Sequence, residues 1–184
     1  MTNYFIEFRF HGKAKREIKN LTYNVNRKFN IFTLKKIRPH ITLVAPFSTN
    51  KEWRLIENFK EVCEKYPLVK FKIKGYGAFE KSRVVYVNVI PSENMIKLRY
   101  DLLRKLKKYC KLNNTDIHSI LGIIKMSKKY FPHVAIAMKL EPNKFRKIKD
   151  YVKSINEPSY EHSLIRMTLI KDNKILYEYD FIRR

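Results

Sequence analysis

Two histidines of this chain stand in nearly the same short sequence, about half a chain apart. The two stretches are Arg38-Pro39-His40-Ile41-Thr42-Leu43 and Phe131-Pro132-His133-Val134-Ala135-Ile136. In each, a Pro-His pair precedes an alternating run that is typical of a β-strand. Imidazole titrates near neutral pH and serves as general base or general acid. Two such rings flanking a phosphodiester could take a proton from the attacking oxygen and give one to the leaving oxygen.

Strand alternation predicts where these side chains point. Successive side chains of a strand face opposite ways, so His40 and Thr42 should share one face, with Ile41 and Leu43 on the core face. In the second strand the pattern predicts one face of His133, Ala135 and Ala137 and a core face of Val134, Ile136 and Met138. Both histidines therefore lie opposite a hydrophobic face, and they would converge if two similar lobes face each other.

Residues near the histidines supply the predicted substrate contacts. The Thr42 hydroxyl could hold a non-bridging phosphate oxygen, whereas Ala135, at the matching position, has no hydroxyl. Arg38, Lys129 and Tyr130 precede the two strands, and cations there would offset charge in the transition state. This chemistry requires no metal and no cofactor. His11, His118 and His162 lack the Pro-His context and are expected to be surface or packing residues.

Composition indicates a globular, strongly basic protein. The 184 residues carry 40 Lys and Arg against 17 Asp and Glu, a net charge of +23. A polyanion such as nucleic acid is the natural partner, although the basic residues are spread along the chain, as compositional bias would also produce.

There is no apolar run of the roughly 20 residues that a membrane span needs and no signal-peptide pattern, which predicts a cytoplasmic protein without membrane association. The two cysteines lie in no metal-binding pattern, and no glycine-rich phosphate loop is present.

Hydrophobic periodicity predicts an α+β fold. Strands are expected at 3–10, 37–47, 69–78, 83–90, 130–140, 164–171 and 174–182, with a tight hairpin turn at Asp172-Asn173. Helices are expected at 14–29, 51–65, 95–110 and 143–155. The order repeats in the second half, so we expect one bilobal, duplicated domain over residues 1–184. Two antiparallel sheets would face a central groove, with helices on the outside.

The two histidine stretches, together with this element order, resemble the paired His-x-Thr/Ser-hydrophobic motifs of the 2H phosphoesterase superfamily. Within it, the chain looks similar to the 2′-5′ RNA ligase family, also described as RNA 2′,3′-cyclic phosphodiesterases. Residues 40–43 fit the first motif, and residues 71–79 with 83–86 resemble the family's hairpin. The resemblance implies opening of 2′,3′-cyclic phosphates to 2′-phosphates and, in some members, reversible 2′-5′ joining. It also implies that His40 protonates the leaving 3′ oxygen and His133 activates water, while Ala135 departs from the second motif.

Three functions are compatible with these features. The first is a metal-independent RNA phosphoesterase or ligase acting on RNA with 2′,3′-cyclic phosphate ends, for which tRNA fragments are one source. The second is an RNA-binding protein on the same fold with weakened or lost catalysis, which accounts equally well for Ala135 and for the charge. The third is a cyclic phosphodiesterase acting on small molecules. A monomer is expected in each case.

Overall fold

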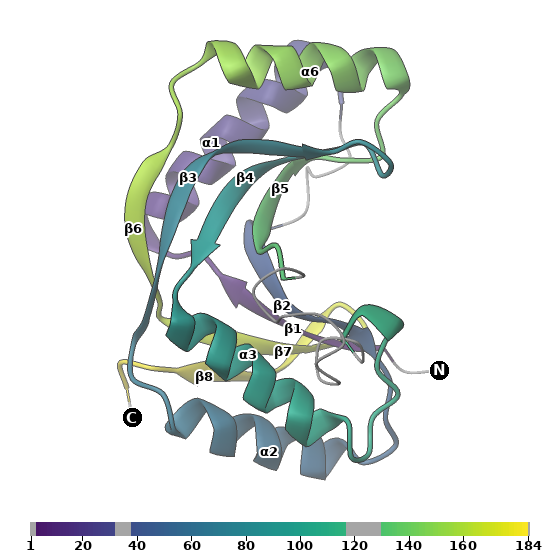
Figure 1. The fold of residues 1–184 in the computed structure, drawn as a ribbon, viewed down its shortest axis with the longest axis vertical. Helices are drawn as coiled ribbons and strands as arrows, with labels where there is room; N and C mark the ends of the chain where they lie inside the picture. Colours follow the sequence, from purple (N-terminus) through teal and green to yellow (C-terminus); the bar gives the residue numbers. More distant parts are fainter. Residues whose placement is uncertain (1–2, 32–37, 117–129, 184) are drawn as a thin grey trace.

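The computed structural model describes residues 3–31, 38–116 and 130–183, and its strands form two four-stranded antiparallel sheets (Figure 1). The first sheet contains β1 (Tyr4–Arg9), β2 (His40–Phe47), β7 (Arg166–Lys171) and β8 (Lys174–Asp180). The second contains β3 (Val69–Phe79), β4 (Val84–Pro91), β5 (His133–Ala137) and β6 (Ser159–Leu164). The spatial orders are β2-β1-β7-β8 and β5-β4-β3-β6. The predicted α+β class with two antiparallel sheets is confirmed.

Helices cover both sheets, and four of them have defined bounds: α1 (Gly12–Phe29), α2 (Glu52–Glu64), α3 (Glu93–Leu106) and α6 (Pro142–Ser154). Helices α2 and α3 pack beside each other, with α2 at the bottom of the view and α3 in front of β7 and β8, and α6 lies across the second sheet (Figure 1). Helix α1 contacts both β5 and α6. Within the described residues, no helix is long and apolar enough to cross a membrane.

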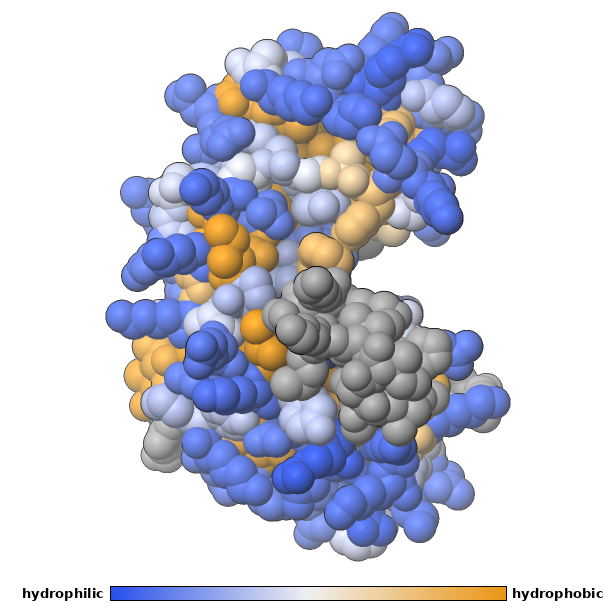
Figure 2. Space-filling model, viewed as in Figure 1, coloured by the Kyte–Doolittle hydropathy of each residue, from blue (hydrophilic) through white to orange (hydrophobic). Residues whose placement is uncertain are grey.

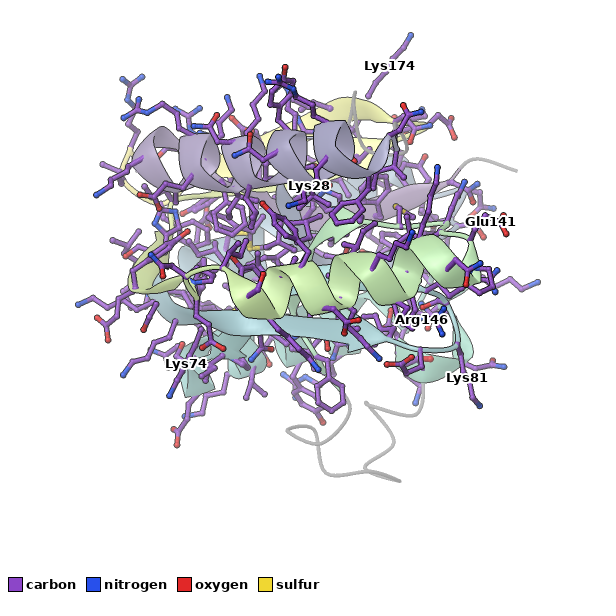
Figure 3. The ribbon with its side chains drawn as sticks, turned by 90° about the horizontal axis from the view of Figure 1, so that it is seen from above. Lys28, Lys74, Lys81, Glu141, Arg146 and Lys174 are labelled. Atoms are coloured by element: carbon purple, nitrogen blue, oxygen red, sulfur yellow. The ribbon has the colours of Figure 1, made fainter. Side chains whose placement is uncertain are left out.

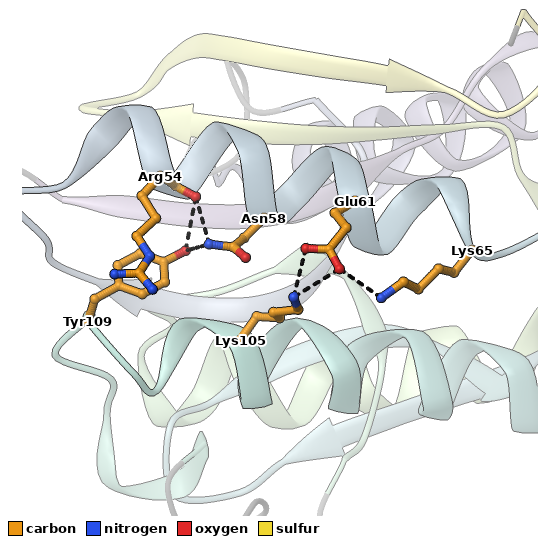
Figure 4. Close-up of polar contacts among 6 residues, drawn as sticks. All are labelled: Arg54, Asn58, Glu61, Lys65, Lys105 and Tyr109. Carbon is orange, nitrogen blue, oxygen red and sulfur yellow. Dashed lines mark hydrogen bonds and ion pairs between the residues drawn. The ribbon is translucent and has the colours of Figure 1, made fainter.

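Polar contacts line one side of the junction between α2 and α3 (Figure 4). The Lys105 ammonium donates to both carboxylate oxygens of Glu61, at 2.9 and 2.7 Å, and Lys65 donates to the same group. Such partly exposed ion pairs stabilise a fold by about 0–1 kcal/mol. The larger contribution comes from the apolar interior, since residues such as Phe59 of α2 and Leu98 of α3 are fully buried.

The closing strands differ from the prediction. A single strand at 164–171 was expected, but Ser159–Leu164 forms β6, which pairs with β3, and Arg166–Lys171 forms β7, which pairs with β1. The chain therefore passes from one sheet to the other at Ile165. The polar sequence of β6 hides this strand, because only its last residue is buried. The hairpin turn is as predicted: Asp172 and Asn173 both have positive φ, which fits a type I′ turn.

The two sheets do not correspond to the two halves of the chain. The first takes its strands from both ends of the sequence, and the second takes all four from the middle. Their spatial orders nevertheless correspond, because each begins with a histidine strand at its edge, β2 in one sheet and β5 in the other. The duplication expected from the sequence is therefore a similarity between two sheets, one of which is inserted in the chain between the strands of the other.

An aromatic cluster joins the two sheets. The Phe8 ring of β1 lies 5.4 Å from the Phe71 ring of β3, and Phe10 stacks on His162 of β6 at 5.5 Å. His162 is thus a packing residue, and its Nε2 has no partner among the described residues. Burial lowers the pKa of His162, and the neighbouring His11 lowers it further. The neutral ring is therefore the form that fits this cluster.

We expect the free energy of unfolding to decrease on acidification, and His162→Phe to reduce that decrease. The unfolded imidazole binds a proton near its usual pKa of 6.5, whereas the folded one resists it. The stabilisation is therefore complete above that pKa and is lost as the pH falls toward the lowered folded value. Urea unfolding between about pH 7.5 and pH 5 measures it. Equal pH dependence in the wild type and the variant would contradict this role.

Candidate active site

The two histidine strands meet at the edges of their sheets. Strands β2 and β5 are edge strands and contact each other near the centre of the molecule, with α1 behind β5 (Figure 1). Both histidines open onto one cavity of about 720 Å³. Its strand side is lined by Arg38, Pro39, His40, Val84, His133, Ala135 and Met138. Figure 2 shows the molecule hollowed on one side between its two halves. The structure thus brings together four of the predicted residues, His40, His133, Arg38 and Ala135.

Both imidazoles are held by the same hydrogen bond. His40 Nδ1 lies 2.9 Å from the carbonyl oxygen of Arg38, and His133 Nδ1 lies 2.9 Å from that of Phe131. A carbonyl oxygen only accepts, so Nδ1 carries the proton and donates it in each case. The proline between carbonyl and histidine has a fixed φ, which restrains this short turn. In the neutral ring, Nε2 is left as the nitrogen that can accept a proton.

A β-bulge follows each histidine at the same position. Leu43 of β2 and Ile136 of β5 are each an extra residue relative to the paired strand. The first five residues of the two strands consequently share one pattern of burial, in which the last two are both buried. A bulge reverses the alternation beyond it. Ala137 is therefore in the core and Met138 lines the cavity, opposite to the faces predicted from strict alternation.

His133 lies in an aromatic surrounding. The Phe79 and Tyr86 rings are 4.9 and 5.1 Å from its ring. Gly77 makes room for Tyr86, because a Cβ at this position would lie 2.4 Å from the Tyr86 ring. Burial lowers the pKa of His133, the bond to the Phe131 carbonyl opposes this effect, and the charge of His40 lowers the pKa further. The neutral imidazole is therefore favoured at this position.

His40 has an acidic neighbour that the sequence analysis missed. Glu7 of β1 is only 3% exposed, and its Oε2 lies 3.8 Å from His40 Nε2. Its other oxygen accepts a hydrogen bond from Arg9, the residue paired with His40 in the sheet. A carboxylate at this distance stabilises a protonated imidazole. The available signal was a lone carboxylate in a largely apolar strand, but its proximity to His40 depends on strand pairing.

Two of the predicted substrate contacts lie at the junction of the strands instead of in the cavity wall. The Tyr130 hydroxyl donates to the Thr42 carbonyl at 3.1 Å, and the Arg99 guanidinium lies 4.4 Å from the centre of the Tyr130 ring. Neither Thr42 nor Tyr130 is among the lining residues. Tyr130 thus ties the segment before β5 to β2. Lys129 and His118 lie outside the described residues.

Basic side chains extend from many sides of the molecule. Figure 3 shows Lys28 on α1, Lys74 on β3, Arg146 on α6 and Lys174 on β8 pointing in different directions. The charge therefore forms no single patch on the described surface. In the same residues, no cluster of three or more His, Cys, Asp or Glu side chains could hold a metal ion.

Comparison with known proteins identifies the family. Residues 12–175 match the model of the 2′-5′ RNA ligase superfamily. The chain belongs to this superfamily. The resemblance inferred from the two histidine motifs, to the 2H phosphoesterases, is thereby confirmed, and phosphoester chemistry on RNA is the activity that this membership supports.

Solved structures show the same fold at low sequence identity. A structure described as a phosphoesterase is 16% identical with a TM-score of 0.53, and each chain covers 97% of the other. Escherichia coli LigT in complex with 3′-AMP is 14% identical with a TM-score of 0.55, covering 97% of this chain and 96% of LigT. LigT without ligand is 15% identical with a TM-score of 0.51, covering 98% of each chain. A search of curated proteins gave no match.

We expect Tyr130→Phe to lower the free energy of unfolding by about 1 kcal/mol, because the Thr42 carbonyl loses its donor in a half-buried setting. Urea unfolding measures the change. Tyr23→Phe is the matched control, because Tyr23 is 61% exposed on α1. Equal stability of the two variants would mean that the Tyr130 hydroxyl does not stabilise the contact between β2 and β5.

Proposed function

We propose that the protein is a metal-independent RNA phosphoesterase that opens 2′,3′-cyclic phosphate ends to 2′-phosphates by acid and base catalysis from two histidines. The observation that carries the proposal is the pair of equally anchored imidazoles, His40 and His133, on one cavity of a 2′-5′ RNA ligase superfamily fold. With a 5′-hydroxyl in place of water as the attacking group, the same two histidines would join it to the cyclic phosphate end in a 2′-5′ linkage, with the 3′ oxygen again as the leaving group.

In the proposed reaction the two rings have opposite tasks. Neutral His133 takes a proton from water through Nε2, and the water oxygen forms a bond to phosphorus. The bond between phosphorus and the 3′ oxygen breaks, and protonated His40 gives its proton to that oxygen. The product carries a 2′-phosphate and a free 3′-hydroxyl. General acid and general base catalysis each contribute about 10²–10⁴-fold in rate.

The surroundings of the rings support this division of roles. The pKa of His133 is lowered by burial, which suits a base that must be neutral before the reaction. Glu7 is placed to stabilise the protonated form of His40, which suits the acid. Glu7 is a positioning residue in this scheme, because it acts through His40. Arg38, two residues before His40, is a cation on the cavity wall that would offset charge on the phosphate.

Ala135 favours a second candidate function, RNA binding with weakened or lost catalysis. A hydroxyl at this position would face the cavity, and a hydrogen bond to a charged group contributes about 1.5–3 kcal/mol. Its absence would slow a catalyst by about one to two decades. A third candidate is a small-molecule cyclic phosphodiesterase. LigT, which shares the fold, has been crystallised with 3′-AMP, a single nucleotide.

The deciding experiment is incubation with RNA that ends in a 2′,3′-cyclic phosphate, in the presence of EDTA. We expect a 2′-phosphate product from the wild type and at least about a 100-fold loss of rate in both His40→Ala and His133→Ala. His162→Phe is the control, because it removes an imidazole that lies outside the cavity lining. Tight RNA binding without opening of the end would support the second candidate. Reaction with cyclic mononucleotides alone would support the third.

The pH profile of kcat/KM tests the division of roles. We expect activity to decrease on acidification only below the usual imidazole value of 6.5, because the pKa of His133 is lowered and the ring stays neutral further into the acid range. Glu7→Gln should lower kcat/KM, because a neutral amide replaces the carboxylate that lies 3.8 Å from His40 Nε2. Glu93→Gln, at an exposed position on α3, is the control. An unchanged kcat/KM in Glu7→Gln would contradict the role of Glu7.

A further inference from the structure

The cavity extends well beyond the two imidazoles. Small-molecule sites have volumes of about 300–1,000 Å³, and this cavity of about 720 Å³ falls within that range. A phosphate between the histidines would occupy only one end of it. The wall away from the strands is formed by α1 and its C-cap residue, which leaves room for a nucleoside beside the phosphate.

The α1 wall has a regular composition. Its lining residues stand four apart in two rows, Lys19-Tyr23-Arg27 and Thr22-Asn26-Asn30. Residues at this spacing share one face of a helix. The first row places an aromatic ring between two cations, and the second row is entirely polar and uncharged. Among the described lining residues there is no Asp or Glu.

The first row fits a single-stranded nucleic acid. Tyr23 is 61% exposed, so one face of its ring is available for stacking. Single-stranded RNA is bound by stacking its bases on aromatic side chains, while basic side chains hold the adjoining phosphates. Lys19 and Arg27 lie one turn to either side of Tyr23 and supply those cations.

The second row contains a buried polar group without a partner. Asn26 is only 8% exposed, and its Oδ1 accepts no hydrogen bond from the described residues. Buried polar groups in folded proteins are almost always paired, so an unpaired one calls for a ligand or a water. The terminal amide has a broad, two-fold torsion. A small rotation would let it accept from and donate to the edge of a base in the cavity.

We propose that this face of α1 is the recognition site for the terminal nucleoside of a single-stranded RNA end. The base stacks on Tyr23, the Asn26 amide pairs with its edge, and Lys19 and Arg27 hold the phosphates of the strand. The inference rests on the proposed function for the position of the scissile phosphate, and it adds the group that selects the substrate. A base-free sugar phosphate would have no group to stack on Tyr23 or to pair with the Asn26 amide.

The test measures binding in the double variant His40→Ala/His133→Ala, so that its outcome does not depend on turnover. The probe is a fluorescent single-stranded RNA of about six nucleotides with a 2′-phosphate end, used intact and with its terminal base removed. Tyr23→Ala should bind the intact probe about tenfold more weakly and the abasic probe with unchanged affinity. Tyr23→Phe should retain binding. Trp53→Ala is the control, because Trp53 is a 66% exposed aromatic residue on α2, outside the cavity.

Matched pairs on α1 test the remaining contacts. Asn26→Ala should weaken binding of the intact probe and leave binding of the abasic probe unchanged. Asn24→Ala, at an exposed position, should leave binding of both probes unchanged. Lys19→Ala should reduce the slope of log K against log salt by about 0.7, the value for one phosphate contact on a single strand. Lys13→Ala should leave this slope unchanged, because the Lys13 side chain is 85% exposed outside the cavity lining.

The outcomes separate this proposal from the proposed reaction. Loss of discrimination between the intact and abasic probes in Tyr23→Ala supports the α1 site even if the wild type opens no cyclic phosphate. The α1 site would be overturned if the parent double variant bound the intact and the abasic probe with equal affinity and Tyr23→Ala did the same. This outcome does not depend on whether the wild type is catalytically active. Circular dichroism of each variant confirms that the loss comes from the site and not from unfolding.

Discussion

The buried guanidinium of Arg99 holds together the two strands on which the proposed chemistry depends. Its Nε donates to the Leu43 carbonyl at the bulge of β2, and its NH2 group pairs with Asp116. It also lies over the Tyr130 ring, whose hydroxyl reaches Thr42. A buried charge costs several kcal/mol unless it is fully paired. Burial raises the pKa of Asp116 while Arg99 lowers it, so the carboxylate depends on this cation. The relative position of β2 and β5 thus depends on one network, in which Arg99 contacts β2, Asp116 and the Tyr130 ring.

The two histidine rings are held by the same kind of hydrogen bond, but different side chains surround them. The bonds from Nδ1 to the carbonyl two residues earlier have the same length, and the bulges follow at the same distance along each strand. The differences lie in the residues that reach the rings from the neighbouring strands, Glu7 beside His40 and Tyr86 beside His133. A duplicated scaffold therefore supplies matched geometry, and different residues on the adjacent strands give each ring its own chemical surroundings. An acid and a base can arise from one motif in this way.

The sequence predicts the features that depend on local periodicity and misses those that depend on strand pairing. Alternation placed His40 and His133 opposite the core, and helical spacing located α1, α2, α3 and α6. Alternation could not reveal the bulge at Ile136, which moves Met138 into the cavity, because a bulge is defined by the partner strand. The polar strand β6 was missed, since its edge position leaves little to bury. Glu7 and Asn26 look ordinary in the sequence and become distinctive only through tertiary neighbours.

The net charge of the protein and the residues of the cavity have different effects on which substrate binds and how it is oriented. A net charge of +23 attracts any polyanion, and this attraction weakens as salt screens it. Basic side chains on many sides of the surface give such a partner no preferred orientation. Orientation has to come from short-range contacts, and the cavity offers them on two walls: imidazoles on β2 and β5, and the mixed basic, aromatic and amide face of α1. In the proposed reaction the surface therefore raises the frequency of encounter, while the short-range contacts of these two walls orient the RNA end.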